Sequence, residues 1–299
     1  MKIVFFGTPD FAVPSLDILI ENKFDVCAVV TAPDKERGRG RKVTFTPVKE
    51  AALKNNIPVL QPEKMNDEKF IEELKKFNAD LFIIVAFRIL PEEVYTIPKL
   101  GSFNLHGSLL PKYRGAAPIQ WAIINGDTKT GVTTFFLEKK VDTGNIILKK
   151  EIPILPEDDF GSLHDKMCVI GAETILETVK LIESDKAVPQ KQNDSEASPA
   201  PKITKETCLI NWNNPAEKIK NLIRGLSPYP AAYFVNSGKN YKVFKCEISN
   251  NKNLKSGEIF QDKNSIIIGT GDKALQILEI QPEGKNRMAA ADFLRGNKL

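Results

Sequence analysis

The first half of the chain alternates short apolar runs with amphipathic stretches, and this alternation limits the possible folds more than any other feature. Apolar runs typical of buried strands lie at residues 2–6, 25–31, 81–86, 132–138 and 146–152. Segments with helical periodicity lie at 9–21, 47–55, 67–77 and 162–183. Strands separated by helices form parallel pairs joined by right-handed crossovers. The sequence therefore predicts an α/β domain with a doubly wound, mostly parallel sheet.

The pattern changes after residue 184. Residues 185–205 are polar, contain three prolines and lack apolar periodicity, as expected of an extended linker. A helix is expected at 215–226, and short strands separated by Gly and Asn turns follow at 232–235, 241–248, 257–261, 265–269 and 274–281. Such strands fit a small closed or partly open barrel, with the OB-fold as the leading candidate. We expect a domain at 1–184, a linker at 185–205 and a second domain at 206–299.

Positive charge is concentrated in the second domain. Residues 206–299 contain 14 Lys and Arg against 9 Asp and Glu, a net charge of +5, whereas the whole chain carries +4. A basic five-stranded barrel suggests nucleic-acid binding. A solvated, lysine-rich surface explains the same excess.

Several classes of protein are disfavoured. The cysteines at 27, 168, 208 and 246 form no Cys-x-x-Cys or Cys/His cluster, so reduced thiols in a cytoplasmic protein without a metal site are expected. No apolar run approaches the roughly 20 residues that span a membrane. After the first strand only Gly7 is present of the three glycines of a dinucleotide fingerprint, which argues against a nicotinamide dehydrogenase.

The segment FNLHGSLLPKYRG contains the strongest candidates for catalysis. Asn104 and His106 lie two residues apart, so a strand would direct both side chains to the same side. An amide can donate to a developing oxyanion, and an imidazole can move a proton near neutral pH. Asp142, in the sequence VDTG, could orient the imidazole if the two residues meet. A structural role for the Asn-x-His pair and a turn-forming role for the aspartate remain alternatives.

A second candidate site is the basic loop DKERGRGRK at residues 34–42. Its cations Arg37, Arg39, Arg41 and Lys42 are interleaved with two glycines. Such a segment is suited to close over a phosphate backbone. A solvated surface loop is the alternative.

Together these segments strongly resemble the methionyl-tRNA formyltransferases, which belong to the 10-formyltetrahydrofolate-dependent formyltransferases. The resemblance covers nearly the whole chain and includes VFFGTPDFAVPSL, FNLHGSLLPKYRGAAPIQ, VDTGNII and LQILEIQPEGKNRM. It implies a Rossmann-like sheet and a tRNA-binding barrel. It also implies transfer of a formyl group from 10-formyltetrahydrofolate, as a co-substrate, to the α-amino group of methionine on initiator tRNA. No metal, membrane or obligate protein partner is implied.

The resemblance also assigns roles to residues. Asn104 and His106 would stabilise the oxyanion, His106 would pass a proton toward the leaving folate nitrogen, and Asp142 would hold His106 and assist deprotonation of the amine. The basic loop would contact the acceptor stem of the tRNA. The folate would be held by two loops, formed by Phe87, Arg88, Ile89 and Leu90 and by Ser108, Leu109, Leu110 and Pro111.

One loop departs from the family's wording. Residues 86–91 read AFRILP, one residue shorter than the family's Tyr-Gly-x-Ile-Leu-Pro wording and without its glycine, so the pterin contacts here are open. Arg88 could reach the site or point to solvent. The alternative functions are a related formyltransferase that acts on a small amine, such as an amino-sugar nucleotide, and a tRNA-binding protein on an inactive enzyme scaffold.

Overall fold

The computed structural model describes residues 1–37, 42–249 and 253–299, and the chain divides into two compact units. The first unit contains Met1–Gly115, Gly131–Ile152 and His164–Pro199. The second contains Ala116–Thr130, Pro153–Leu163 and Ala200–Leu299. Two short segments that precede residue 164 therefore belong to the second unit.

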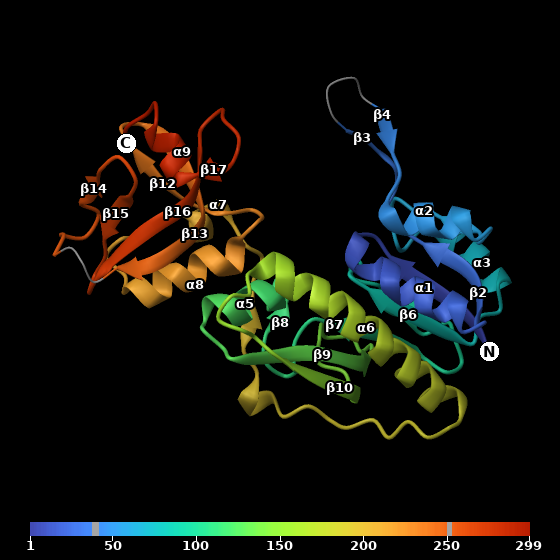
Figure 1. The fold of residues 1–299 in the computed structure, drawn as a ribbon. Helices are drawn as coiled ribbons and strands as arrows, with labels where there is room; N and C mark the ends of the chain where they lie inside the picture. The colour runs from blue at the N-terminus through green and yellow to red at the C-terminus, as the bar shows by residue number, and fades with distance from the viewer. Residues whose placement is uncertain (38–41, 250–252) are drawn as a thin grey trace. The chain divides into compact units, whose positions relative to one another are not determined.

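The first unit is built on a seven-stranded sheet with the order β10-β9-β7-β6-β1-β2-β5 (Figure 1). The strands are β1 (Lys2–Gly7), β2 (Asp25–Val30), β5 (Val59–Leu60), β6 (Leu81–Val85), β7 (Ser102–His106), β9 (Lys129–Phe136) and β10 (Ile146–Pro153). Neighbouring strands from β7 to β5 run parallel, and β9 runs antiparallel to β7. The predicted doubly wound, mostly parallel sheet is confirmed.

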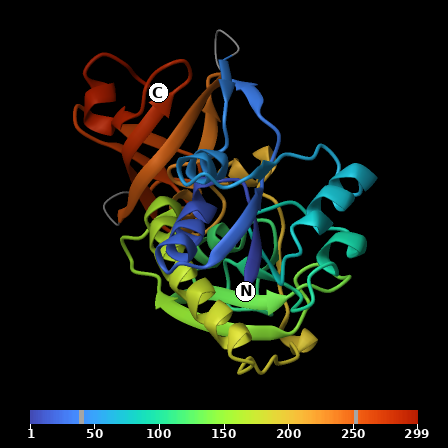
Figure 2. The same cartoon turned by 90° about the vertical axis from the view of Figure 1, so that its right-hand side faces the viewer.

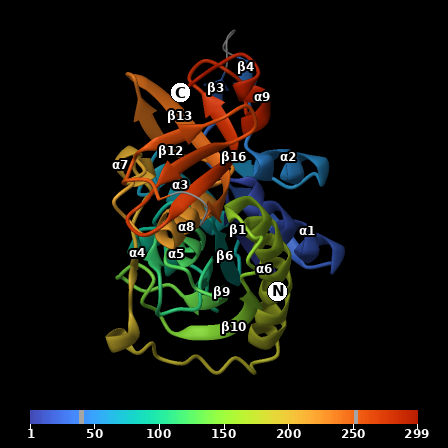
Figure 3. The same cartoon turned by 60° about the vertical axis from the view of Figure 1, so that its left-hand side comes forward.

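Helices cover both faces of this sheet. They are α1 (Val13–Glu21), α2 (Pro47–Lys54), α3 (Glu68–Lys76), α4 (Glu92–Tyr95) and α6 (Phe160–Glu183). Figures 2 and 3 show α1 and α6 on one face and α3 and α4 on the other. On the second face, Phe70 and Leu74 of α3 pack in one buried cluster with Phe6 of β1 and Phe82 of β6. Burial of this apolar surface stabilises the layered arrangement.

Two of these helices begin at side chains that cap them. Thr46 accepts a hydrogen bond from the Lys49 backbone N–H at 3.1 Å, and Asp67 accepts one from the Phe70 N–H at 3.1 Å. Each cap satisfies a donor that the first helical turn leaves without a partner. The predicted helices at 47–55 and 67–77 are therefore confirmed to within a residue at each end.

The parallel strands β1, β6 and β7 end at the same edge of the sheet. Gly7 pairs with Val85, and Val85 pairs with Leu105, so the ends of β1 and β6 lie level with the last but one residue of β7. The loops that follow these strands consequently open at one edge, where α/β sheets carry their binding sites.

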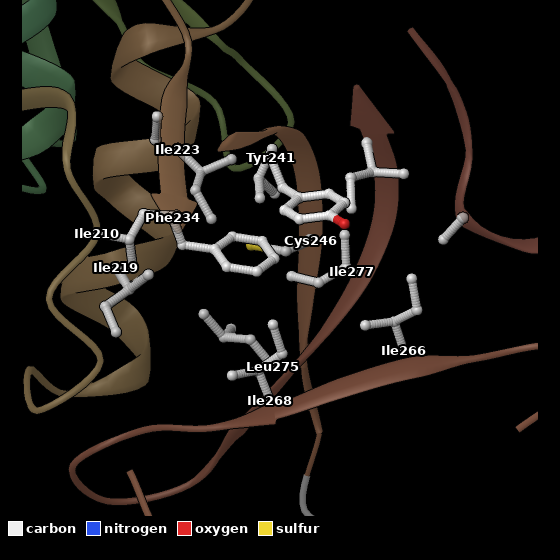
Figure 4. Packing of buried hydrophobic residues seen from close by; sticks show 14 of the residues in the cluster. Ile210, Ile219, Ile223, Phe234, Tyr241, Cys246, Ile266, Ile268, Leu275 and Ile277 are labelled. Atoms are coloured by element: carbon white, nitrogen blue, oxygen red, sulfur yellow. The ribbon is translucent and has the colours of Figure 1, made fainter. Parts of the chain in front are cut away.

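The second unit contains a six-stranded antiparallel sheet in the order β12-β13-β16-β15-β14, with β17 paired to β16. Its strands are β12 (Ala232–Asn236), β13 (Lys239–Ser249), β14 (Ile259–Gln261), β15 (Ile266–Gly269), β16 (Ala274–Pro282) and β17 (Met288–Ala289). Helix α8 (Ala216–Leu226) packs Ile219 and Ile223 against Phe234 and Tyr241 in the core (Figure 4). The predicted partly open barrel is confirmed.

The sequence analysis missed the short elements. These are β3 (Lys35–Arg37), β4 (Lys42–Thr44), β8 (Arg114–Gly115), α5 (Pro118–Ile124), η2 (Asp194–Glu196), β11 (Pro199–Ala200), α7 (Lys205–Cys208) and α9 (Ala290–Leu294), together with β5, α4 and β17. The 3-10 helix η1 (Asp10–Ala12) lies within the helix predicted at 9–21. Segments of two to seven residues are too short to display a period, and their conformation is set by their neighbours.

We predict that two of the four thiols resist alkylation in the native protein. Burial raises the pKa of Cys168 and of Cys246 to about 12 in each case, so little thiolate is present at pH 8. Cys27 is the most exposed of the four and should label first with iodoacetamide. Mass spectrometry of labelled peptides over time would give the order, with urea-denatured protein as the control. Equal labelling rates for Cys246 in native and denatured protein would contradict this prediction.

Candidate active site

Strand β7 carries Asn104 and His106 on the same side of the sheet, at the edge where β1, β6 and β7 end. The Asn104 side chain is partly exposed, and no group among the described residues hydrogen-bonds its amide. His106 is 5% exposed. The structure thus offers one free amide donor beside a buried imidazole.

The imidazole of His106 is held by a backbone carbonyl. Its Nε2 lies 2.8 Å from the carbonyl oxygen of Tyr113. Because a carbonyl oxygen only accepts, Nε2 carries the proton and donates it. The remaining ring nitrogen, Nδ1, faces the carboxylate of Asp142.

Asp142 lies in the turn between β9 and β10 with a φ of 55°, in the left-handed region. Its Oδ2 accepts a hydrogen bond from the Gly115 N–H at 2.9 Å and lies 3.9 Å from His106 Nδ1. The second distance is too long for a hydrogen bond but places the carboxylate beside the ring. The structure therefore brings together the three residues that the sequence singled out, although Asp142 follows His106 by 36 residues.

The turn that contains Asp142 packs closely on β9. A Cβ atom at Gly144 would lie 1.7 Å from the carbonyl oxygen of Phe136, so only glycine fits. On the other side, the buried side chain of Gln192 donates to the carbonyl oxygens of Asp142 at 2.9 Å and Gly144 at 2.8 Å. Sequence analysis missed Gln192 because its surroundings have the composition of a linker.

The first expected folate loop follows β6. Ile89 is 73% exposed, Phe87 is half-buried and Leu90 is buried. Arg88 turns away from solvent, and its guanidinium donates to the backbone carbonyls of Pro62 and Glu63. Arg88 therefore ties this loop to the one after β5 and presents Ile89 at the surface.

The second expected folate loop follows β7 and is largely closed on itself. Ser108, Leu110 and Pro111 are buried, and Leu109 is half-buried. The Ser108 hydroxyl donates to the Lys112 carbonyl at 2.6 Å, and its own carbonyl accepts from Thr133 at 2.6 Å. In this conformation the loop's buried side chains support its backbone, and their part in folate binding stays a prediction.

The basic loop emerges as an antiparallel ribbon formed by β3 and β4. Arg37 pairs with Lys42 across the ribbon, whereas Arg39 and Arg41 lie outside the described residues. At its base, Lys49 of α2 donates to the carboxylate of Asp34 and, at 2.7 Å, to the side-chain oxygen of Gln61. The hydrogen bond from Lys49 holds the pKa of the Asp34 carboxyl below its usual range. The ribbon is therefore anchored where it leaves the domain.

Comparison with known proteins identifies the family. Residues 1–179 match the formyl transferase family, and residues 202–298 match the formyl transferase C-terminal domain. A methionyl-tRNA formyltransferase of Caldanaerobacter subterraneus subsp. tengcongensis is 50% identical over 302 residues, which cover 100% of this chain and 98% of the relative. The chain belongs to the methionyl-tRNA formyltransferase family. A methionyl-tRNA formyltransferase of Bacteroides thetaiotaomicron is 47% identical over 310 residues. The alignment covers 100% of this chain and 96% of that relative.

Two solved structures have folds similar to that of this member of the methionyl-tRNA formyltransferase family. The N-formyltransferase from Helicobacter canadensis, in complex with folinic acid and dTDP-3-aminofucose, has a TM-score of 0.69 at 24% identity, with 93% of this chain and 98% of that chain covered. HypX from Aquifex aeolicus, in complex with tetrahydrofolic acid, has a TM-score of 0.67 at 19% identity. The alignment covers 98% of this chain but 47% of HypX, so the chain spans about half of HypX. At these identities the likeness shows the fold alone.

Within residues 1–37, 42–249 and 253–299, no group of three or more His, Cys, Asp or Glu side chains is arranged to hold a metal ion. Among the helices of the same ranges, none has the length and apolar character needed to cross a bilayer.

We predict that Gly144→Ala displaces the turn that carries Asp142. The added methyl group overlaps the Phe136 carbonyl, so the turn must move away from β9 and draw Asp142 from Gly115. The expected result is at least a tenfold loss of formyl transfer. The matched control is Gly296→Ala, because a Cβ there meets no atom within 4 Å and Gly296, like Gly144, does not have a left-handed φ. Equal activity of the two variants would show that close packing of the turn is not required.

Proposed function

We propose that this protein transfers the formyl group of 10-formyltetrahydrofolate to the α-amino group of methionine on initiator methionyl-tRNA, in the cytoplasm. The observation that carries the proposal is the meeting of Asn104, His106 and Asp142 at one edge of the sheet, in a chain 50% identical over its full length to a methionyl-tRNA formyltransferase. The amine forms the new C–N bond, the bond between the formyl carbon and folate N10 breaks, and one proton passes from the amine to N10.

In this proposal Asn104 stabilises the tetrahedral intermediate. Attack of the amine converts the formyl oxygen to an oxyanion, which the free amide of Asn104 receives as a hydrogen-bond donor. Because the donor is fixed on β7 before the reaction, it gains strength as the charge develops and needs no reorganisation. A donor of this kind contributes about 2.7–4 kcal/mol to transition-state stabilisation.

His106 acts through Nδ1. Its Nε2–H is engaged by the Tyr113 carbonyl, so Nδ1 is the nitrogen that moves a proton to folate N10 and donates to the oxyanion. Asp142 lies 3.9 Å from Nδ1, so its carboxylate can orient the ring without occupying Nδ1 in a direct hydrogen bond. The same carboxylate takes the proton of the attacking amine, directly or through water.

In this proposal the formyl donor is a substrate. The exposed residues at the edge of the sheet fit the chemistry of its pterin ring. The pterin is apolar on its faces and rich in hydrogen-bonding groups on its edge. The loop at 87–90 offers the exposed side chain of Ile89 and the half-buried ring of Phe87 for the faces. The loop at 108–111 supplies backbone groups and shape, because most of its side chains point inward. That a related N-formyltransferase binds folinic acid supports this assignment.

Transfer RNA is proposed to contact two basic regions. Arg37, Arg39, Arg41 and Lys42 of the ribbon take the acceptor stem, and the carboxy-terminal barrel, with its net charge of +5, takes the body of the tRNA. In this proposal residues 1–184 are the catalytic domain, 185–205 connect the domains, and 206–299 bind tRNA without an obligate protein partner.

A formyltransferase that acts on an amino-sugar nucleotide is the second candidate. It is favoured by the shared fold with the Helicobacter canadensis enzyme, whose complex contains dTDP-3-aminofucose. An assay that offers charged initiator tRNA, elongator methionyl-tRNA and amino sugars side by side separates the two functions. Formylation of the sugar alone would overturn the proposal.

Substitution of the three site residues tests the mechanism. We expect Asn104→Ala, His106→Ala and Asp142→Asn each to lower kcat for formyl transfer by about a hundredfold or more, with tRNA affinity nearly unchanged, because all three act on charge that develops in the transition state. Single-turnover rates and filter binding of charged tRNA would measure the two quantities.

Matched controls are available in α6. His164→Ala removes the chain's other histidine, and Asp165→Asn removes an exposed carboxylate that contacts His164. Both should keep near wild-type rates. A site variant that retains more than half of wild-type activity would refute the role given to that residue.

Substitution in the basic loop separates tRNA binding from chemistry. Arg39 stands between Gly38 and Gly40, so we expect it to approach the phosphates closely, and Arg39→Ala should impair tRNA binding while leaving folate binding intact. Loss of one phosphate contact should also reduce the slope of log affinity against log salt by up to about one unit. The exposed Lys76→Ala on α3 is the matched loss of a cation. If log tRNA affinity falls with log salt at the same slope in both variants, Arg39 does not contact the tRNA and recognition of tRNA depends on the barrel.

A further inference from the structure

Residues 190–198, here called the strap, are hydrogen-bonded to the loops of the candidate active site, although their composition predicts an extended linker. Gln190 exchanges two backbone hydrogen bonds with Ile146, at 2.7 and 2.8 Å. At the other end, Ser198 accepts from the Tyr113 N–H at 2.9 Å through its hydroxyl and from the Arg114 N–H at 2.8 Å through its carbonyl. The strap is thus attached to both loops that supply partners to His106.

Gln192 is the buried residue at the centre of the strap. Its side chain is 6% exposed in a segment whose neighbouring side chains are exposed. Its Nε2 donates to the carbonyls of Asp142 and Gly144, and its Oε1 accepts from the Arg114 guanidinium, at 3.2 Å from Nε and 2.7 Å from Nη2. Because carbonyls only accept and guanidinium only donates, this network fixes the orientation of the amide.

Only an amide satisfies both sides of this contact. A carboxylate at position 192 would still accept from Arg114 but would face two carbonyl oxygens with no proton to donate. An apolar side chain would leave the Asp142 and Gly144 carbonyls and the Arg114 guanidinium without these partners. The buried, fully used amide therefore has a specific task at this position.

The contacts of Gln192 close a ring around Asp142. Gly115, which donates to the Asp142 carboxylate, follows Arg114 directly in β8. The ring thus runs from the Asp142 carboxylate to Gly115, through Arg114 to Gln192, and back to the Asp142 carbonyl. It holds Asp142 in the left-handed region, where non-glycine residues are uncommon although aspartate is one of those found there more often.

We propose that Gln192 is a positioning residue of the active site, which fixes the carboxylate of Asp142 opposite Nδ1 of His106. This inference rests on the proposed catalytic role of Asp142. Gln192 itself contacts no reacting atom. It acts by holding the backbone of the Asp142 turn and by tying that turn to the β8 loop.

Asp194 lies at the outer end of the same chain of contacts. It accepts from Arg114 Nη2 at 2.7 Å, and this hydrogen bond holds the pKa of the Asp194 carboxyl below its usual range. Its side chain is 71% exposed, so water can replace the contact. Asp194→Asn should accordingly change the rate of formyl transfer less than twofold, whereas loss of Gln192 should lower kcat.

The test compares Gln192→Leu and Gln192→Glu with Gln190→Leu. Gln190 lies two residues away on the same strap, its side chain is exposed, and its bonds to Ile146 are made by its backbone. We expect both substitutions at Gln192 to lower kcat at least tenfold, with KM for 10-formyltetrahydrofolate and for charged tRNA within about twofold of wild type, and Gln190→Leu to behave as wild type. Gln192→Glu nearly preserves shape and keeps the Arg114 contact, so it serves as the second variant if Gln192→Leu does not fold.

A double-mutant cycle with Asp142→Asn separates positioning from general stability. If Gln192 acts through Asp142, then adding Gln192→Glu to Asp142→Asn should lower kcat by less than a further threefold. If the two losses multiply, Gln192 serves the fold at large and the inference is wrong. Retention of full activity by Asp142→Asn would overturn the proposed role of Asp142 and the inference with it. An impaired Asp142→Asn together with an active Gln192→Glu would overturn the inference alone.

The Gly115 amide gives a readout that does not depend on activity. Its N–H donates to the Asp142 carboxylate, so its hydrogen exchange reports whether that carboxylate is in place. Exchange should accelerate at least tenfold in Gln192→Glu, as in Asp142→Ala, and remain unchanged in Gln190→Leu. Unchanged protection of Gly115 in Gln192→Glu would contradict the positioning role.

Discussion

The hydrogen bond from the Gly115 amide to the Asp142 carboxylate joins two loops that the sheet by itself does not bring together. Asp142 follows β9, which is antiparallel to β7, and Gly115 follows the long loop that begins at His106. The sheet sets the height of His106 at the edge, but the distance between Nδ1 and the carboxylate depends on where these two loops meet. The 3.9 Å contact, and the chemistry proposed for it, depend on that junction and on the contacts of Gln192 that support it.

The same loop from His106 to Gly115 satisfies one imidazole nitrogen and leaves the other for reaction. It turns back so that the Tyr113 carbonyl receives the Nε2 proton, with Tyr113 itself at a φ of 60°. A buried imidazole with both nitrogens engaged by fixed partners could not exchange a proton with a substrate. A buried imidazole with neither engaged would be free to rotate. Anchoring Nε2 on a backbone acceptor and aiming Nδ1 at a carboxylate meets both requirements.

The sequence predicts the framework well because strands and helices have periods that it displays. The parallel sheet, the long helix α6 and the antiparallel barrel follow from runs of four residues or more. The polar-apolar-polar order of Asn104, Leu105 and His106 indicates that Asn104 and His106 share a side. Gln192 has no such signal. Its contacts join it to residues 48 to 78 positions earlier, and the polar composition that predicts a linker also describes a strap bound through its backbone. The ribbon β3–β4 was missed for a related reason, since three-residue strands show no alternation.

The first unit has two proposed tasks, formyl transfer and contact with tRNA, and different parts of it are assigned to each. Around His106 the polar groups described above have fixed internal partners, and the free amide of Asn104 is the exception, which the proposed reaction uses for the oxyanion. The ribbon has the opposite design. Its base is anchored by Asp34, Lys49 and Gln61, and beyond that anchor the sequence places arginines between glycines, where little apolar surface can be buried. Phosphates require charge that can adjust to a partner's surface, whereas an oxyanion requires a donor fixed in advance. The two demands are met by different segments of the chain, the basic ribbon between β2 and α2 and the proposed reacting groups on β7 and in the turn after β9.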